Sequence, residues 1–293
     1  MKLIVTNDDF AATYGFTEAI KNTFSKGITT STSIEVNGPA FAYSVKLLKT
    51  TLKTIGLNLH LNLNHGKGYA EELIDKNNDY KYSVFHYFFL FQNPSKQLLQ
   101  AIKKDLNYQF EIAFKAGLNP TSVNGHNHIH LVPPIFEIVC QLCNKYNIKY
   151  IRLPREPFFI SQPLIKNIQP FLNKNLGRFL LANYFANKNI ITMQKYKMKT
   201  TSAFYGLMYT NYMDTWAIKS SLLNAMKKGF DSVEILGHPA LVHDKRDTNF
   251  TCKFMSWYSQ TKERTTEAKA FQNQDLKKFI QKHNIELISF NNL

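Results

Sequence analysis

The sequence has few cysteines, no long apolar run and far fewer acidic than basic residues. Three cysteines in 293 residues are an odd number, so we expect no disulfide framework. Cys140 and Cys143 form a CxxC inside the apolar helical pattern PIFEIVCQLCNKY. Because no second ligand pair accompanies them, we interpret both as helix-packing residues rather than as a redox or zinc site.

No segment approaches the roughly 18 uncharged apolar residues that a membrane helix requires, so we expect no membrane partner. The N-terminal segment MKLIVTNDDF is too short in its apolar part, and too acidic, for a signal peptide. We therefore expect a cytoplasmic location.

Basic residues outnumber acidic ones by 36 to 21, which gives a net charge of +15. Such a charge permits an acidic partner. The lysines are spread along the chain, however, and the densest basic run, KNIITMQKYKMK at 188–199, is modest. We favour a solvated surface, keep an anionic ligand as the alternative, and do not expect a nucleic-acid partner.

Apolar runs rich in β-branched residues alternate with amphipathic stretches, which is typical of parallel βα units. The expected strands are 3–7, 29–36, 55–63, 122–129, 150–153, 201–205, 233–237 and 286–289. The expected helices are 14–25, 40–50, 96–116, 134–146, 164–186, 215–227 and 263–283. Seven or eight units predict an α/β fold over 1–293, a single-domain (β/α) barrel that is TIM-like and closed or nearly closed. A doubly wound open sheet is the alternative.

The segment 65–94 interrupts this alternation and is interpreted as a βα insertion above the mouth of the barrel. Its aromatic run VFHYFFLF, at 84–91, suits a buried helix or a subunit-interface patch. The functional alternative is a surface on which sugar rings stack, or a lid.

Polar residues follow several expected strands at their carboxyl ends, where parallel barrels carry their chemistry. The first strand runs into Asp8 and Asp9, and two adjacent buried carboxylates are costly unless a cation or strong donors compensate. Alternatively, Asp9 caps the helix that begins near Tyr14. In GLNLHLNL, His60 shares one strand face with two asparagines, which favours a site over a satisfied core histidine.

The densest polar motif is NGHNHIHLVPP, in which His126, His128 and His130 occupy every second position. They line one face if the strand continues through them, and they cluster at its end if the chain turns. Three packed imidazoles leave several ring nitrogens to satisfy, and neutral imidazoles commonly bind divalent metals. Further candidates are Arg152 and Arg155 in YIRLPRE, and His238, which is either structural or a general acid.

Together these residues resemble the YdjC-like carbohydrate deacetylases, a family that includes chitooligosaccharide deacetylases and proteins associated with hopanoid biosynthesis. The shared segments are TNDDF, TTSTSIEVNGPA, GLNLHLNL, NGHNHIHLVPPIF, IRLPRE, TSAFYG and ILGHPA, in the family's order. The resemblance implies a (β/α) barrel related to polysaccharide deacetylases. It also implies a hydrolase that removes the N-acetyl group from an N-acetylated sugar or oligosaccharide, commonly as a homodimer.

The resemblance further implies one divalent metal ion, with Asp9, His60 and His126 as its ligands. Asp8 corresponds to the base that accepts a proton from metal-bound water, and His238 to the acid that protonates the departing amine. The residues expected to bind substrate or orient these groups are Asn124, His128, His130, Arg152 and Arg155. The family is usually described with magnesium, whereas this ligand set chemically suits zinc or another transition metal such as cobalt or iron.

Three positions depart from the family's usual pattern. Asn7 stands where alanine is common, and Ala11 replaces a glycine. Asn124 replaces an aspartate, which removes a charge beside the expected ligands. The alternatives are a metal-dependent phosphoesterase, a glycosyl-transfer-related enzyme, and a non-enzymatic barrel that binds metal or nucleic acid. We find no phosphate-cradling glycine loop that would support glycosyl transfer.

Overall fold

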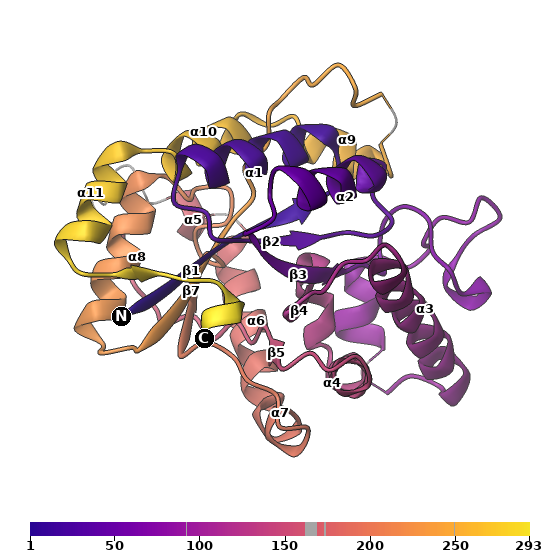
Figure 1. Cartoon of the computed structure of the whole chain (residues 1–293). Coiled ribbons are helices and arrows are strands. Elements are labelled where there is room, and N and C mark those ends of the chain that lie inside the picture. The colour runs from indigo at the N-terminus through magenta and orange to yellow at the C-terminus, as the bar shows by residue number, and fades with distance from the viewer. Residues whose placement is uncertain (92, 162–168, 173, 249) are drawn as a thin grey trace.

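A computed structural model of the protein describes residues 1–91, 93–161, 169–172, 174–248 and 250–293. Its centre is a parallel sheet with the strand order β5-β4-β3-β2-β1-β7-β6, and β8 pairs with β1 (Figure 1). The strands are β1 (Lys2–Phe10), β2 (Ser31–Ile34), β3 (Gly56–Leu61), β4 (Ser122–Gly125), β5 (Tyr150–Ile151), β6 (Ala203–Tyr205), β7 (Ser232–Gly237) and β8 (Glu286–Leu287). Each of the eight expected strands is present, and this confirms the parallel α/β pattern.

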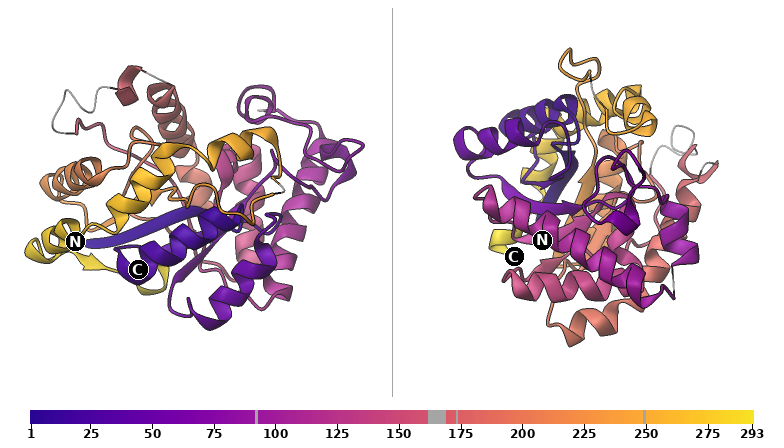
Figure 2. Two further views of the ribbon diagram at one scale, coloured as in Figure 1. Left: turned by 90° about the horizontal axis from the view of Figure 1, so that it is seen from above. Right: turned by 90° about the vertical axis from the view of Figure 1, so that its right-hand side faces the viewer.

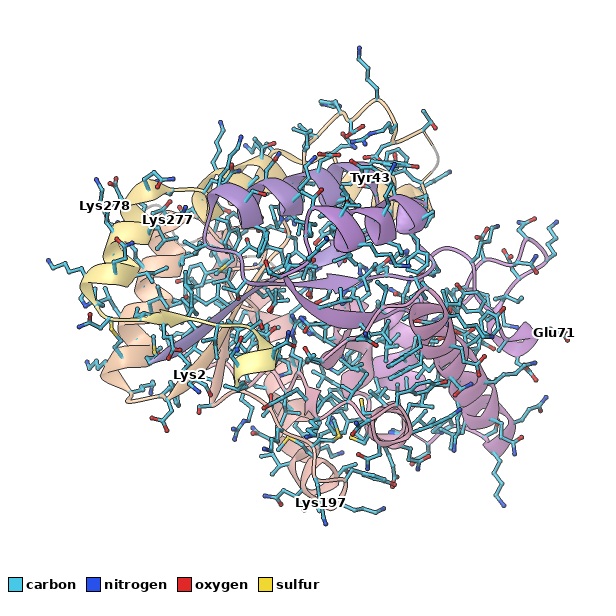
Figure 3. The ribbon with its side chains drawn as sticks, in the orientation of Figure 1. Lys2, Tyr43, Glu71, Lys197, Lys277 and Lys278 are labelled. Atoms are coloured by element: carbon cyan, nitrogen blue, oxygen red, sulfur yellow. The ribbon has the colours of Figure 1, made fainter. Side chains whose placement is uncertain are left out.

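Helices surround the sheet, as Figures 1 and 2 show. They are α1 (Tyr14–Lys26), α2 (Phe41–Thr50), α3 (Lys96–Lys115), α4 (Pro133–Lys145), α5 (Gln169–Leu172), α6 (Asn175–Lys188), α7 (Ile190–Lys195), α8 (Thr215–Lys227), α9 (Lys253–Tyr258), α10 (Lys262–Phe271) and α11 (Gln274–Lys282). In Figure 1, α1, α2, α9 and α10 lie above the sheet, and α3 and α4 lie to its right and below. Side chains fill the space between the layers, whereas Lys197, Lys277 and Lys278 extend outward at the periphery (Figure 3).

The two ends of the sheet approach each other. An isolated parallel bridge joins Tyr150 of β5 to Lys199, which precedes β6, and the Ile151 amide donates to the Lys199 carbonyl over 2.9 Å. No ladder joins β5 to β6 within the described part of the chain. The strands therefore form a curled parallel half-barrel, and closure into a full barrel stays a prediction.

Two expected helices differ from the structure. The range 263–283 is divided into α10 and α11, because the Asn273 side chain accepts from the Leu276 amide and starts a new helix. The range 164–186 contains α5 and α6, with 162–168 and 173 outside the described residues. Cys140 and Cys143 are buried in the main apolar core along α4, which confirms that they are packing residues.

The segment 65–94 is anchored to α3 by a buried carboxylate. Asp105 accepts hydrogen bonds from the Tyr69 and Ala70 amides and from the Tyr80 hydroxyl. The aromatic run contains a short π-helix, η2 (His86–Leu90), whose Tyr87 and Phe88 are buried. Phe85 and Phe89, by contrast, are exposed, so the expectation of a buried helix holds for only part of the run. No described helix is both long and apolar enough to cross a membrane.

Candidate active site

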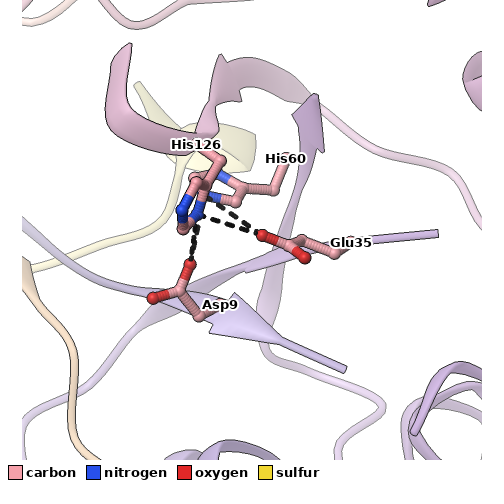
Figure 4. A group of neighbouring side chains, drawn as sticks. All are labelled: Asp9, Glu35, His60 and His126. Atoms are coloured by element: carbon pink, nitrogen blue, oxygen red, sulfur yellow. Dashed lines mark hydrogen bonds and ion pairs between the residues drawn. The ribbon is translucent and has the colours of Figure 1, made fainter. Parts of the chain in front are cut away.

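Four ionisable side chains meet at the carboxyl edge of the sheet (Figure 4). Asp9 comes from β1, Glu35 follows β2, His60 comes from β3 and His126 follows β4. All four are buried, and each offers one ligand atom within 4.8 Å of those of the others. Parallel strands bring their carboxyl ends to one edge, which is why positions more than a hundred residues apart meet here. The structure thus groups Asp9, His60 and His126 as expected, and adds Glu35.

The backbone around Asp9 has an unusual conformation. The pairing of β1 with β2 is irregular between Asn7 and Phe10, and both Asp9 (φ 65°) and Ala11 (φ 78°) adopt left-handed conformations. Non-glycine residues in this region store strain that is common at functional sites. The alternative role of Asp9 as a helix cap is wrong, because the Thr13 hydroxyl caps α1 by accepting from the Phe16 amide.

The chain turns sharply after the fourth strand. β4 ends at Gly125, and Asn127 (φ 51°) and His128 (φ 57°) reverse its direction within a short helical segment, η3 (His126–Leu131). The expected strand over 122–129 is therefore too long, and the three histidines separate instead of lining one face. His126 points into the cluster, whereas the His130 Nε2 donates to the Arg152 carbonyl over 3.0 Å.

The orientation of His60 is fixed by Asn124. The two residues are partners across β3 and β4, and the His60 Nδ1 lies 2.5 Å from the Asn124 Oδ1. Because the amide oxygen only accepts, the imidazole proton resides on Nδ1, which leaves Nε2 free to face the Asp9 Oδ1 at 3.4 Å. The amide nitrogen of Asn124 donates to the Ser33 hydroxyl over 2.8 Å. Asparagine thus supplies the acceptor that positions His60, although it lacks the charge of an aspartate.

Several buried polar atoms of the cluster accept or donate no hydrogen bond in the described structure. The Asp9 Oδ2, both Glu35 oxygens and the Nε2 atoms of His65 and His126 are buried without a hydrogen-bond partner in the described structure. The His126 Nδ1 lies 3.0 Å from the Asp9 Oδ1 and 3.2 Å from the Glu35 Oε1. Buried polar atoms without partners are rare unless an ion or water completes the site.

The pKa shifts of the carboxylates and imidazoles also indicate that the cluster favours a positive charge. Burial opposes ionisation of Asp9, yet the adjacent His126 holds the pKa of that carboxyl well below its usual range. Likewise, burial opposes protonation of His126, yet Asp9 and Glu35 raise its pKa to about 10. Carboxylates that hold protons on neighbouring imidazoles would hold a cation in the same place.

Beside this cluster, Asp8 is held by a buried arginine. The Arg152 guanidinium donates to both Asp8 oxygens, over 2.5 and 3.0 Å, and to the Glu234 Oε1 over 2.7 Å. Burial opposes ionisation of Asp8, but Arg152 keeps the pKa of Asp8 well below its usual range. Asp8 is therefore ionised at neutral pH and is a rigidly oriented acceptor.

A cavity of about 540 Å³ opens over these groups. Asp8, Asp9, His60, His126, His128 and His238 line its floor and walls. The position of His238 is fixed through its main chain, because its amide donates to the Glu267 carboxylate over 2.6 Å and its carbonyl accepts from Arg264 over 2.8 Å. Burial lowers the pKa of the His238 imidazole. Arg155 is not among the described residues that line this cavity. The guanidinium that binds Asp8 is that of Arg152.

Reasoning from the sequence missed Glu35, His65 and Glu234. Glu35 follows a β-branched strand in STSIEV, which is the positional signal that singled out Asp8 and His60, so the same rule was sufficient to find it. His65 lies at the start of the insertion, with its Nε2 3.4 Å from the Glu35 Oε1. No sequence signal marks Glu234, whose role depends on Arg152 reaching across the sheet.

A curled parallel sheet with buried carboxylates and imidazoles at its carboxyl edge defines an α/β protein with a candidate metal centre. The family model described as YdjC-like protein matches residues 2–282, so the chain belongs to the YdjC-like family. Carbohydrate deacetylases of Clostridium beijerinckii and Brevibacillus brevis are 26% and 24% identical to it, each over 100% of both chains. A third, from Geobacillus stearothermophilus, is 30% identical over 55% of this chain and 61% of its own.

The fold also matches a solved structure from Enterococcus faecalis V583, described provisionally as a cellobiose-phosphate cleavage protein. The TM-score is 0.72 at 18% identity, covering 99% of this chain and 98% of that one. At this identity the likeness concerns the fold alone.

Proposed function

We propose that this protein is a carbohydrate deacetylase that uses one divalent metal ion to hydrolyse the acetamide of an N-acetylated sugar. The observation that carries the proposal is the buried group of Asp9, Glu35, His60 and His126, next to the Asp8–Arg152 pair; all of the group but Glu35 line the cavity. The relatives that align over the whole chain are carbohydrate deacetylases, which supports the same reaction.

The side chains fit a divalent ion. Two imidazoles and a carboxylate are a common set of ligands for a catalytic metal, and the Glu35 carboxylate brings a further ligand atom within 4.8 Å of theirs. We assign Asp9, His60 and His126 as ligands. Glu35 is either a fourth ligand or the carboxylate that orients His126. A bound divalent ion would polarise the acetyl carbonyl and lower the pKa of water.

The remaining groups have separate roles in amide hydrolysis. Asp8, ionised and oriented by Arg152, accepts a proton from the attacking water as the bond from oxygen to the acetyl carbon forms. His238, on the cavity wall, donates a proton to the sugar nitrogen as the C–N bond breaks. The products are acetate and a free amino sugar. The side chains of His128 and of the cavity rim would contact the substrate.

The experiment is an acetate-release assay on N-acetylglucosamine oligomers, with metal-free protein resupplied with magnesium, zinc, cobalt or iron. We expect no acetate without metal, and recovery with at least one ion. Asp9→Ala and His126→Ala should abolish both metal binding and acetate release. Full activity of either variant, or of the metal-free protein, would refute the proposal.

Glu35→Gln separates a ligand or orienting role from a purely structural one. The amide keeps the shape of the side chain but loses its charge, so we expect metal affinity to fall by roughly 10–100-fold. Titration calorimetry with the metal alone measures this without reference to activity. Glu156→Gln, which makes the same change at a buried carboxylate outside the cluster, is the control for general perturbation.

A further inference from the structure

Part of the exposed apolar surface lies beside the cavity mouth. The residues Phe85, Phe89, Leu176, Leu180 and Tyr184 are exposed, and we call them the α6 face. Leu176, Leu180 and Tyr184 recur every four residues and so form a stripe along the outer side of α6. A buried helix would show the reverse, with its polar residues outward.

The α6 face is continuous with the cavity over the active site. Phe85 and Phe89 stack with ring centroids 4.9 Å apart, and Phe85 also lines the cavity. Phe89 and Tyr184 line a neighbouring groove of about 620 Å³. Leu181 and Phe88 line both hollows. The apolar surface therefore extends from the rim of the candidate active site outward along α6.

Basic residues predominate around the α6 face. The 57 residues from 157 to 213 contain no aspartate or glutamate but seven lysines and arginines. On α6 and at its start, Lys174, Arg178 and Lys188 are exposed beside the stripe, and the Lys188 ammonium lies 5.1 Å from the centre of the Tyr184 ring. Lys197 extends outward beyond α7 (Figure 3). Glu137, the acidic residue that lines the groove, is paired with Lys195 at 2.8 Å.

We propose that the α6 face docks the protein peripherally on a membrane surface rich in anionic lipids, with the cavity mouth beside the headgroups. Leucine and aromatic side chains flanked by lysines, with the nearby Glu137 carboxylate already paired with Lys195, are the chemistry that binds the interface of an anionic bilayer. The lack of a long apolar run excludes only a spanning helix, so this docking is compatible with the sequence. The proposal is independent of the deacetylase assignment.

A second copy of the chain fits this face less well. A two-fold contact would place the same patch on itself, so the cations beside each stripe would face cations. An anionic bilayer instead satisfies the cations and accepts the apolar side chains together.

The test is sedimentation of the full chain with vesicles of phosphatidylcholine, with or without about 30% phosphatidylglycerol. We expect binding to the anionic vesicles that weakens in high salt. Leu176→Ser/Leu180→Ser should weaken it by roughly tenfold or more. Lys174→Gln/Lys188→Gln should weaken it by a similar factor and reduce its salt dependence.

The matched control is Leu223→Ser/Leu287→Ser, which removes two exposed leucines elsewhere (49% and 40% exposed, against 37% and 58% for Leu176 and Leu180). It should bind as the unaltered protein does. Absence of binding, or an equal loss in control and test variants, overturns the proposal. The proposal is also overturned if the protein binds no vesicles and light scattering shows a dimer that Leu176→Ser/Leu180→Ser disrupts. Acetate release from a soluble oligomer, measured in parallel, should be unchanged in these variants. The two assays therefore test the membrane proposal and the deacetylase proposal independently.

Discussion

Replacing Arg152 by methionine is the sharpest perturbation that the structure offers. Arg152 is buried between Asp8 and Glu234, which are themselves buried, and it donates two hydrogen bonds to each of them. Methionine fills a similar volume but leaves both carboxylates without their cation. Breaking a buried ion pair from one side costs about 3–5 kcal/mol, so we expect the free energy of unfolding to fall by at least that amount at neutral pH.

The pH dependence of this loss has a definite sign. Arg152 holds the pKa of Asp8 below its usual value of 3.8. Without Arg152, we expect burial, the largest influence on this carboxyl, to raise its pKa above 3.8 against the smaller opposing effects of His60 and His238. The folded variant then binds a proton that the unfolded chain releases, so its stability falls as pH rises above about 4. The deficit relative to the unaltered protein should therefore be small in acid and largest at neutral pH. Denaturant unfolding at several pH values measures it.

A double variant separates stability from positioning. Arg152→Met/Glu234→Gln removes one of the two stranded charges and should recover about 1–3 kcal/mol. Asp8 remains without its two guanidinium bonds, so kcat should stay reduced by roughly 10²–10⁴-fold. A loss below about 1 kcal/mol in Arg152→Met, or full activity in the double variant, would refute the reasoning.

Three further predictions follow from single positions. Burial lowers the pKa of His130 from 6.5 to about 3, so the unfolded chain gains a proton that the folded chain excludes. Stability should therefore fall as pH drops from 6.5 towards 3, and His130→Gln should reduce this slope in pH-dependent melts, because His128 and His238 contribute to it as well. Ala11→Gly relieves a left-handed conformation (φ 78°) and should raise the free energy of unfolding by about 1 kcal/mol; no gain would argue against strain there. Asp105→Asn places an amide group opposite the N–H donors of Tyr69 and Ala70, so the free energy of unfolding should fall by about 1–3 kcal/mol. Backbone amide exchange near Tyr69 should become faster, and unchanged exchange would contradict the anchoring role.

Much of the site was predictable from the sequence because function follows strand ends in a parallel sheet. One rule about the carboxyl ends of strands selected Asp8, Asp9, His60, His238 and the group of three histidines that begins at His126. The family resemblance then singled out His126 within that group. The cysteines of α4 were equally predictable, since their helical spacing placed them on an apolar face. Local pattern thus determined the order of elements and most of the candidate site residues.

Tertiary structure decided the rest. Whether NGHNHIH continues as a strand depends on the backbone at Asn127 and His128, where left-handed conformations turn the chain and divide the three histidines among different partners. Glu35 joins the cluster only because β2 lies between β1 and β3, and neither this neighbour order nor the curl of the sheet is written in local periodicity. Arg152 forms hydrogen bonds with Asp8 and Glu234, which lie on strands far apart in the sequence. Only the tertiary structure determines which carboxylates lie within reach of such a long side chain.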